Sequence, residues 1–297
     1  MQHLPVLAKE ISQIFSKHLS DKSVFVDGTV GLAGHTIELA KTFDRQKKKV
    51  IIIGIDQDLK MLTLALENIK KNKTKCEIYL KKENYAELYL VLKNYQLTGA
   101  DGILLDLGVN SAQFGDLERG FSFNAEKLDM RFDESQNLTA RSVVNHYSEK
   151  ELGNILAKYG EIRGAFSLAK KIVEARPIKT ALELKKILEQ NYQTRKGKIN
   201  PATLVFQALR IEVNNELKNL ENFLKSIKNI LNPGGIVAII SFHSLEDRLV
   251  KNYFRKLVES GEFEYLGEKL ITPSAEEIAQ NPRARSAKLR VINKVKN

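Results

Sequence analysis

Hydrophobic positions follow two different spacings in the first third of the chain. Between Val6 and Leu19 they recur at helical spacing, whereas residues 23–27 and 50–55 form short runs rich in β-branched side chains. Continuous apolar runs of this kind are typical of strands buried on both faces of a parallel sheet. The alternation predicts helices at 6–19, 35–43, 59–69 and 86–95, and strands at 23–27, 50–55, 76–80 and 102–106. We therefore expect a doubly wound α/β sheet.

The strand pattern stops at about residue 114 and returns only after Pro201. Between them we expect four helices, at 140–147, 149–159, 165–175 and 181–191, with Ser148 and Thr180 as N-caps for two of them. The alternation then predicts a helix at 217–231, a Pro233-Gly234-Gly235 turn, a strand at 236–242, a helix at 245–258 and strands near 263–266 and 289–295.

This interruption predicts the domain organisation. We expect an α/β domain formed by residues 1–113 and 208–297, with a helical domain at 114–207 inserted between its fourth and fifth strands.

The charge of the chain points to a class of partner. The 297 residues carry a net charge of +11, and a basic surface attracts polyanions, of which nucleic acids are the commonest. A lysine-rich composition alone would give the same net charge, but the clustering of basic residues along the chain favours a binding surface. Residues 282–297 hold six basic side chains and no acidic one, and further basic clusters lie at 45–49, 70–75 and 195–198.

Several classes of protein are disfavoured. The longest apolar runs are too short to cross a bilayer, and the first residues lack the pattern of a secretory signal, so we expect a soluble, cytoplasmic protein. The single cysteine, Cys76, excludes an internal disulfide and a cysteine-rich metal site. His35 and His243 have no metal-ligand companions, and we expect no required metal.

The loop after the first expected strand indicates the kind of ligand. Its glycines, Gly28, Gly31 and Gly34, are spaced G-x-x-G-x-x-G rather than G-x-G-x-x-G, and Asp27 immediately precedes them. A carboxylate there would repel a pyrophosphate, which prefers bare backbone N–H groups. S-adenosylmethionine carries an ammonium and a sulfonium and no phosphate, so an acid near this loop favours it over a dinucleotide.

Two further acids end strands. Asp56 ends the second strand, where a carboxylate can accept both hydroxyls of a ribose, and Asp106 ends the fourth. Acids at strand ends are often plain helix caps. Three of them at the ends of the first, second and fourth strands favour a bound adenosine compound.

Several long segments resemble the bacterial 16S rRNA cytosine-N4 methyltransferases, the RsmH or MraW family. The resemblance covers nearly the whole chain. It rests on residues 3–7, 27–29, 34–35, 101–109, 118–123, 128–131, 206–213, 241–248 and 281–290, the last reading NPRARSAKLR.

The resemblance implies a class I S-adenosylmethionine-dependent methyltransferase fold with a helical insertion for RNA recognition. It implies methylation of the exocyclic N4 amine of a cytidine in the decoding region of 16S rRNA, with the small ribosomal subunit as partner. By the family's motifs the cofactor-binding residues are Ala33, Gly34, His35, Asp56, Tyr85, Asp106 and Gln113.

The chain departs from the family's pattern at three places. The glycine-rich loop carries Leu32 and Ala33. Residues 110–113 read NSAQ where the family typically has SSPQ, and residues 204–206 read LVF where it has RTF. These departures affect the geometry of the loop and two positions that could face RNA.

Candidate catalytic residues follow the fourth strand. The cytosine amine is a poor nucleophile, and a group that accepts its hydrogens would favour attack on the methyl, with alignment supplying much of the acceleration. Asp106 or Asn110 is expected to accept them, although Asp106 could equally serve only the cofactor. His243 is a candidate for substrate binding or for a structural role.

RNA contacts are expected from arginines of the insertion and the basic tail, namely Arg119, Arg131, Arg163, Arg283 and Arg285, some of which could be plain surface residues. The target base must leave any stack. Phe121, Phe123 and Phe132 could stack on it, although aromatic residues in such a stretch are more often core.

Three rival functions remain open. A methyltransferase of this fold could act on DNA or protein, and assays with each acceptor would separate these. A non-catalytic RNA-binding or ribosome-assembly factor would fail to bind S-adenosylmethionine. A nicotinamide oxidoreductase is opposed by Asp27 and the glycine spacing. The oligomeric state does not follow from the sequence.

Overall fold

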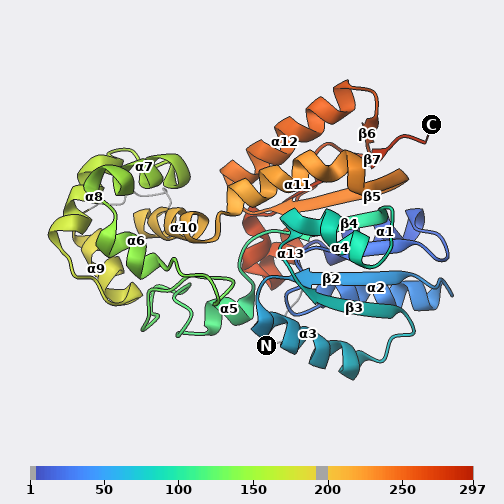
Figure 1. Ribbon diagram of the computed structural model, residues 1–297, viewed down its shortest axis with the longest axis horizontal. Coiled ribbons are helices and arrows are strands. Elements are labelled where there is room, and N and C mark those ends of the chain that lie inside the picture. The colour runs from blue at the N-terminus through green and yellow to red at the C-terminus, as the bar shows by residue number, and fades with distance from the viewer. Residues whose placement is uncertain (1–4, 192–199, 297) are drawn as a thin grey trace. The chain divides into compact units, whose positions relative to one another are not determined.

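The computed structural model describes residues 5–191 and 200–296, which form two compact units (Figure 1). The first unit spans Met1–Gly108 and Lys218–Asn297, and the second spans Val109–Leu217. The expected insertion, 114–207, falls within the second range, and its role as a separate RNA-recognition domain stays a prediction. Of the features expected from the sequence, His3, Leu4 and the basic cluster at 195–198 lie outside the described residues.

The first unit is built on a seven-stranded sheet of order β3-β2-β1-β4-β5-β7-β6. Its strands are β1 Val24–Asp27, β2 Ile51–Asp56, β3 Glu77–Lys82, β4 Ala100–Asp106, β5 Leu231–Ser241, β6 Phe263–Tyr265 and β7 Lys288–Lys294. Strands β1 to β5 pair in parallel, and β7 is antiparallel to both β5 and β6. The sheet confirms the expected fold class, a doubly wound α/β fold of the class I methyltransferase type.

Helices cover both faces of this sheet (Figure 1). They are α1 Ala8–His18, α2 Gly34–Arg45, α3 Leu59–Asn72, α4 Leu88–Asn94, α11 Glu216–Ile230, α12 Ser244–Glu259 and α13 Ala275–Gln280, with short 3-10 turns η1 Tyr85–Glu87 and η2 Pro282–Ser286. Successive strand residues point to opposite faces. Phe25 and Ile52 therefore pack with α1 and α2, whereas Val26 and Ile53 pack with α4, α11 and α12.

One expected feature of the first unit is wrong. Pro233-Gly234-Gly235 does not form a turn before a strand but lies inside β5. Leu231 pairs with Ala100 and Ile236 pairs with Gly102, so the register shifts between these two pairs. Gly234, at φ +78°, allows the strand to absorb the extra residues as an irregularity, and the sheet continues on both sides of it.

The second unit consists of helices around its own core. They are α5 Ser111–Gly115, α6 Ala140–His146, α7 Glu149–Gly160, α8 Ala165–Glu174, α9 Ala181–Asn191 and α10 Pro201–Asn214. The two expected N-caps are confirmed: Ser148 and Thr180 each accept a hydrogen bond from the backbone N–H three residues on, Glu151 and Glu183.

Helix α10 did not follow from the sequence. Asn200 caps it and Pro201 occupies its first turn, which are ordinary start signals. Its buried residues lie all round the helix, however, because it runs through the middle of the second unit's core. A helix with buried residues on most of its sides shows little of the amphipathic spacing by which a surface helix is recognised.

Candidate functional site

The three acids expected at strand ends lie along one edge of the sheet. Asp27 is in register with Gly54 on one side and Leu104 on the other, so Asp56 and Asp106 extend two residues beyond it. In a parallel sheet the carboxyl ends of neighbouring strands meet at the same edge, where open α/β sheets bind their ligands.

The glycine loop between β1 and α2 is held from both neighbouring strands. The backbone N–H of Gly28 donates to Leu104 O (2.9 Å), and that of Val30 donates to Ile55 O (2.9 Å). The Thr29 hydroxyl accepts from the backbone N–H of Asp106 (2.7 Å). The loop is therefore a fixed surface over the ends of β1, β2 and β4.

Two loop residues adopt left-handed backbone conformations, Gly31 at φ 50° and Ala33 at φ 63°. The second brings the chain directly into α2, whose first residues are Gly34, His35 and Thr36. The first N–H groups of a helix have no partner within the helix and carry partial positive charge. The expected cofactor residues Ala33, Gly34 and His35 thus present an electropositive helix end at the ligand edge of the sheet.

Asp27 fixes this loop through hydrogen bonds to two threonines. Its carboxylate is buried and accepts hydrogen bonds from the Thr36 hydroxyl (2.7 Å) and the Thr29 N–H (3.3 Å). Burial raises the pKa of Asp27, and the nearby His35 and these hydrogen bonds partly offset that effect. These contacts give Asp27 a structural role in the loop, and the expectation that it also lines the ligand pocket stays a prediction.

Asp56 is partly buried at the end of β2, and each of its carboxylate oxygens accepts one backbone N–H. Oδ2 accepts from Gly31 (3.0 Å) and Oδ1 from Asp58 (2.9 Å). Desolvation raises the pKa of Asp56 to about 7 despite these hydrogen bonds. Each carboxylate oxygen has lone pairs beyond the one used here, so Asp56 can still accept hydroxyl donors.

His35 and Asp106 form a polar pair with unmet hydrogen-bonding capacity. The His35 ring is 94% buried and its Nε2 lies 3.5 Å from Asp106 Oδ2. Neither ring nitrogen of His35, nor Oδ1 of Asp106, has a hydrogen-bond partner in the described structure. Buried polar groups are nearly always satisfied, so these atoms indicate a place where a polar ligand completes the site.

Tyr85 lies beside the same edge. It opens η1 after β3, and its ring packs edge-on against Phe223 with a centroid distance of 5.9 Å. The backbone N–H of Glu83 donates to Asp56 O (3.1 Å), which ties the segment before Tyr85 to the end of β2. Tyr85 therefore lies close to Asp56, and its role beside the cofactor stays a prediction.

His243 follows β5 and caps α12. Its Nδ1 accepts from the backbone N–H of Glu246 (3.4 Å), and its Nε2 lies 3.1 Å from Glu246 Oε1. Glu246 is itself buried and accepts from the backbone of Phe242 (2.9 Å). The Nδ1 contact supports a capping role, but the buried Nε2 makes no hydrogen bond with the described residues, so substrate binding and a structural role both stay predictions for His243.

Asn110 and Gln113 belong to the second unit and form a reciprocal cap on α5. Asn110 Oδ1 accepts from the backbone N–H groups of Ala112 (2.9 Å) and Gln113 (3.0 Å), and Gln113 Oε1 accepts from the N–H of Asn110 (3.1 Å). The Asn110 oxygen is thus already engaged, which makes it a weaker candidate than Asp106 for accepting an amine. The role of Gln113 in the cofactor pocket stays a prediction.

Arg119 and Arg131 serve the interior of the second unit. Arg119 is 3% exposed and donates to the carbonyl oxygens of Arg131 (2.8 Å) and Phe132 (3.1 Å). Arg131 binds Asp129 through two nitrogens, both at 2.8 Å, and donates to two further carbonyls. These contacts argue against the expected RNA contacts of both residues, because their guanidinium groups are used to fold the 119–136 segment.

The three phenylalanines considered for base stacking pack with one another and with α10. Phe121 and Phe132 are buried and stack at 5.4 Å, and Phe123 packs edge-on against Phe206 at 4.7 Å. Their core role is the one the structure supports.

The basic tail divides into two groups. Arg290 and Lys288 bind Asp247 (2.7 and 3.2 Å) within the sheet unit. Arg283 and Arg285, in contrast, are exposed in η2, as an RNA contact requires.

Two residues that hold the site were not anticipated, Thr29 and Thr36. Thr29 lies two residues after Asp27, and Thr36 lies two residues after Gly34, the last glycine of the loop. A threonine hydroxyl gives no distinctive signal in the sequence, so neither could be singled out. In the described part of the chain, no group of three or more His, Cys, Asp or Glu residues is placed to hold a metal ion. Within the same residues, no helix is long and apolar enough to cross a membrane.

Comparison with known proteins matches the whole chain to one family. The family model described as the MraW methylase family matches residues 1–295. Proteins named ribosomal RNA small subunit methyltransferase H are similar over 99% of this chain. They include relatives from Sulfurihydrogenibium sp. (47% identity, 100% of the relative covered), Elusimicrobium minutum (45%, 98%) and Thermosipho africanus (43%, 98%).

Proposed function

The chain belongs to the MraW methylase family, and from this premise we propose that it is an S-adenosylmethionine-dependent methyltransferase of 16S rRNA. Its acceptor is the exocyclic N4 amine of a cytidine in the decoding region of the small ribosomal subunit. The observation that carries the proposal is the unsatisfied His35–Asp106 pair beside the electropositive start of α2, at the ligand edge of a methyltransferase-type sheet. The names of the relatives, which are small subunit rRNA methyltransferases, support the choice of acceptor.

The residues at the sheet edge fit the parts of this cofactor. The first N–H groups of α2, at Gly34 and His35, bind the methionine carboxylate, as helix N-termini bind anions. Asp56 accepts the ribose hydroxyls, and Tyr85 flanks the adenine. Asp106 lies where a cation is favoured, because its Oδ1 has no hydrogen-bond partner among the described residues. When bound, the cofactor supplies an activated methyl group carried by a sulfonium.

Asp106 is the group best placed to act on the cytosine amine. Its free carboxylate oxygen accepts a hydrogen from the amine, so that the nitrogen lone pair is turned toward the methyl group. The Asp106 carboxylate would then take up the proton that the amine loses on receiving the methyl group from the cofactor. Asn110 is the alternative acceptor, although its oxygen already caps α5.

RNA binding is assigned to the exposed arginines of η2, Arg283 and Arg285, together with the helical unit. Backbone phosphates attract such side chains without reading sequence, so they position the RNA while the pocket selects the base. The target cytidine leaves any stack to reach the sheet edge.

The proposal is tested with small subunits from a strain that lacks this protein. The subunits, naked 16S rRNA and DNA are each incubated with the purified protein and isotopically labelled S-adenosylmethionine, and the nucleosides are then analysed by mass spectrometry. We expect labelled N4-methylcytidine in the 16S rRNA, from subunits or from naked RNA. Label on another base, on DNA only or on no nucleic acid would overturn the proposal.

The role of Asp106 is tested separately with Asp106→Asn, which keeps the shape of the side chain. If Asp106 accepts the amine, turnover falls while cofactor affinity, measured by calorimetry, is largely kept. If Asp106 serves only the cofactor, affinity falls in parallel with turnover. A variant with near-normal turnover and affinity would dismiss both roles.

A further inference from the structure

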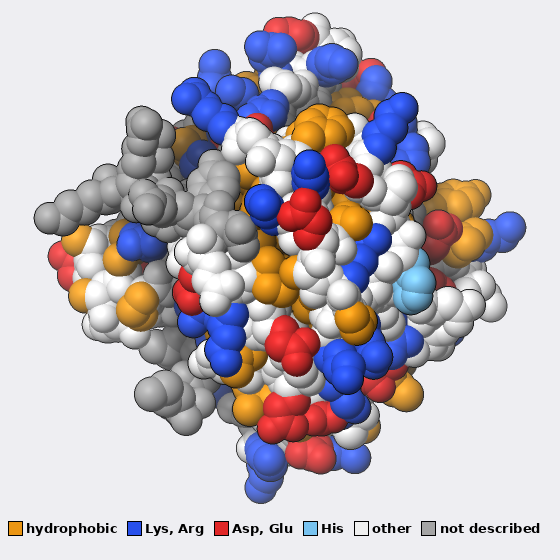
Figure 2. All heavy atoms as spheres, turned by 90° about the vertical axis from the view of Figure 1, so that its left-hand side faces the viewer, with side chains coloured by type: hydrophobic (Ala, Val, Ile, Leu, Met, Phe, Trp, Pro, Cys, Tyr) orange, Lys and Arg blue, Asp and Glu red, His pale blue; other side chains and the backbone are white. Residues whose placement is uncertain are grey.

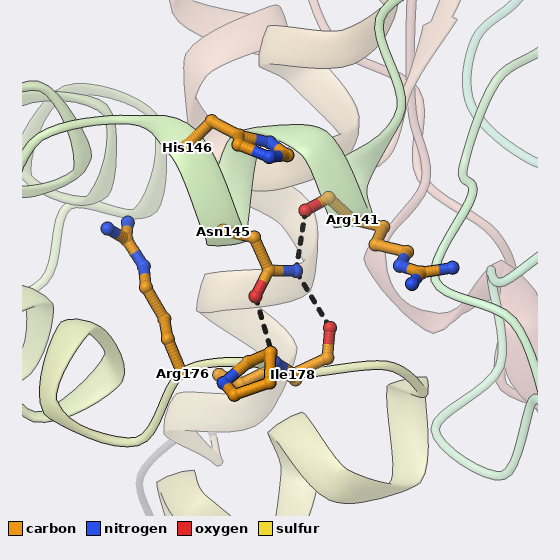
Figure 3. A pocket seen from close by; sticks show the side chains of 6 residues that line it. Arg141, Asn145, His146, Arg176 and Ile178 are labelled. Atoms are coloured by element: carbon orange, nitrogen blue, oxygen red, sulfur yellow. Dashed lines mark hydrogen bonds between the residues drawn. The ribbon is translucent and has the colours of Figure 1, made fainter.

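The second unit contains a pocket for which the family resemblance gives no role (Figure 3). It has a volume of about 380 Å³ and lies between the end of α6 and the segment that joins α8 to α9. The residues that line it are Arg141, Asn145, His146, Arg176, Pro177 and Ile178.

A side-chain amide fixes the shape of this pocket. Asn145 Nδ2 donates to the carbonyl oxygens of Arg141 (2.8 Å) and Ile178 (2.7 Å), and Asn145 Oδ1 accepts from the N–H of Ile178 (2.8 Å) (Figure 3). Two of these bonds join the two walls, and the third lies within α6, so the pocket is preformed rather than a gap between independent segments.

The pocket is cationic and has no acidic lining residue. Arg176 donates through Nε to Val144 O (2.7 Å) and through Nη2 to Tyr147 O (2.5 Å), both of them neutral carbonyls. Burial lowers the pKa of Arg176, which shows that its charge is partly stripped of water. Arg141 is exposed, and its guanidinium makes no ion pair or hydrogen bond with the described residues. The two arginines extend on opposite sides of Asn145 in Figure 3.

Several basic side chains of the second unit lie beside acidic ones. Figure 2 shows one face of the molecule on which both kinds of side chain occur. Lys127 is paired with Glu118, Lys171 with Glu174 and Lys185 with Glu189. The two arginines of the pocket have no carboxylate partner among the described residues.

We propose that this pocket binds one nucleotide of the RNA substrate outside the target cytidine. The phosphate lies against the exposed guanidinium group of Arg141, and the sugar or base lies over Pro177 and Ile178, while Arg176 adds positive charge on the other side of Asn145. Guanidinium groups match the oxygens of a phosphate in pairs, and the volume suits a ligand of nucleotide size. The inference rests on the proposed function, because it takes the RNA substrate as the occupant.

The test compares two substitutions that each remove one positive charge from the second unit. Arg141→Gln alters the pocket without breaking a described contact, and Lys186→Gln, on α9, lies outside the lining. Affinity for 16S rRNA transcribed in vitro is measured by fluorescence anisotropy across a salt series. S-adenosylmethionine affinity is measured for each variant by calorimetry.

We expect Arg141→Gln to weaken RNA binding by about fivefold or more, with Lys186→Gln close to the unaltered protein. The slope of log affinity against log salt should become shallower by about 0.7, the value for one phosphate contact on single-stranded RNA. Arg141→Lys, which keeps the charge, should restore most of the slope. S-adenosylmethionine affinity should be unchanged in all three variants.

Equal RNA affinities and slopes for Arg141→Gln and Lys186→Gln would overturn the pocket's role while leaving the proposed function intact. Failure of the unaltered protein to methylate RNA, with S-adenosylmethionine affinity absent, would instead overturn the proposed function. The two failures are therefore distinguished by separate measurements.

Discussion

The raised pKa of Asp56 predicts that binding of an adenosine ligand depends on pH near neutrality. Desolvation at the end of β2 brings this pKa to about 7, so an appreciable fraction of the carboxyl groups is protonated at pH 6. Ribose hydroxyls are held by the ionised form, because a carboxylate accepts hydrogen bonds from both. Ligand binding and protonation of Asp56 therefore compete.

The magnitude follows from that competition. For a pKa of about 7, the apparent Kd exceeds its value at high pH by a factor of about 11 at pH 6 and about 1.1 at pH 8. We thus expect affinity to fall about tenfold from pH 8 to pH 6. Ligand binding favours the ionised carboxylate and so lowers the pKa of Asp56. About one proton is therefore released per ligand bound at pH 6, and affinity rises with pH.

The assay is isothermal titration calorimetry with adenosine and S-adenosylmethionine from pH 6 to pH 8. Adenosine is the sharper probe, because it has no group that titrates in this range, whereas the methionine α-amino group titrates near its upper end. The matched control is Asp56→Asn, which cannot ionise. Its affinity should be lower at pH 8, by about 1.5–3 kcal/mol for hydrogen bonds to a charged group, and flat with pH.

Two results would refute this reasoning. If adenosine binds the unaltered protein equally well at pH 6 and pH 8, then Asp56 is either fully ionised throughout or does not hold the ribose. If Asp56→Asn keeps the tenfold dependence, another group titrates on binding. Repeating each titration in two buffers of different ionisation enthalpy counts the released proton directly.

Three further predictions concern stability, each measured by urea unfolding. Gly120→Ala should lower the free energy of unfolding by about 3 kcal/mol, because Gly120 has φ +78° and an added Cβ would lie 2.4 Å from the Asp129 backbone nitrogen. The control Gly115→Ala, whose added Cβ would have nothing within 4 Å, should change it by less than about 1 kcal/mol. Equal effects of the two substitutions would contradict the strain argument. Thr36→Val should cost about 1.5–3 kcal/mol through the lost hydrogen bond to a buried carboxylate, and an unchanged midpoint would show that this bond contributes nothing. Asn214→Ala should cost about 2–4 kcal/mol, since the buried amide makes two hydrogen bonds to the 130–132 segment and a third to Arg210 O within α10; a cost under 1 kcal/mol would mean that water replaces them.

The ligand edge of the sheet could be predicted from the sequence because its positions follow from strand geometry. Once buried runs ending in Asp56 and Asp106 are recognised as parallel strands, their carboxyl ends must meet at one edge. No information about side-chain contacts is needed for that step. The alternation of strands and helices predicted the fold class for the same reason, since a two-sided sheet imposes continuous apolar strands.

The environment of individual charged residues could not be predicted in this way. Arg119 and Arg285 both have small residues as neighbours in the sequence. Arg119 is nevertheless buried among carbonyl oxygens, whereas Arg285 is exposed. The partners of Arg119 lie more than ten residues away, and their position depends on how the 119–136 segment folds back on itself. Residue type alone therefore overestimates how many cations are available to RNA.

One departure from the family's glycine loop, Ala33, is partly compensated within the loop itself. Ala33 adopts a left-handed conformation that costs a non-glycine residue roughly 1–2 kcal/mol. Its side chain is fully buried with Val30, Leu62 and Ala65, and burial of one methyl group returns about 0.8 kcal/mol. The backbone enters α2 directly after Ala33. Under the proposed function the loop binds through backbone groups, so a side chain that packs inward does not occupy the binding surface.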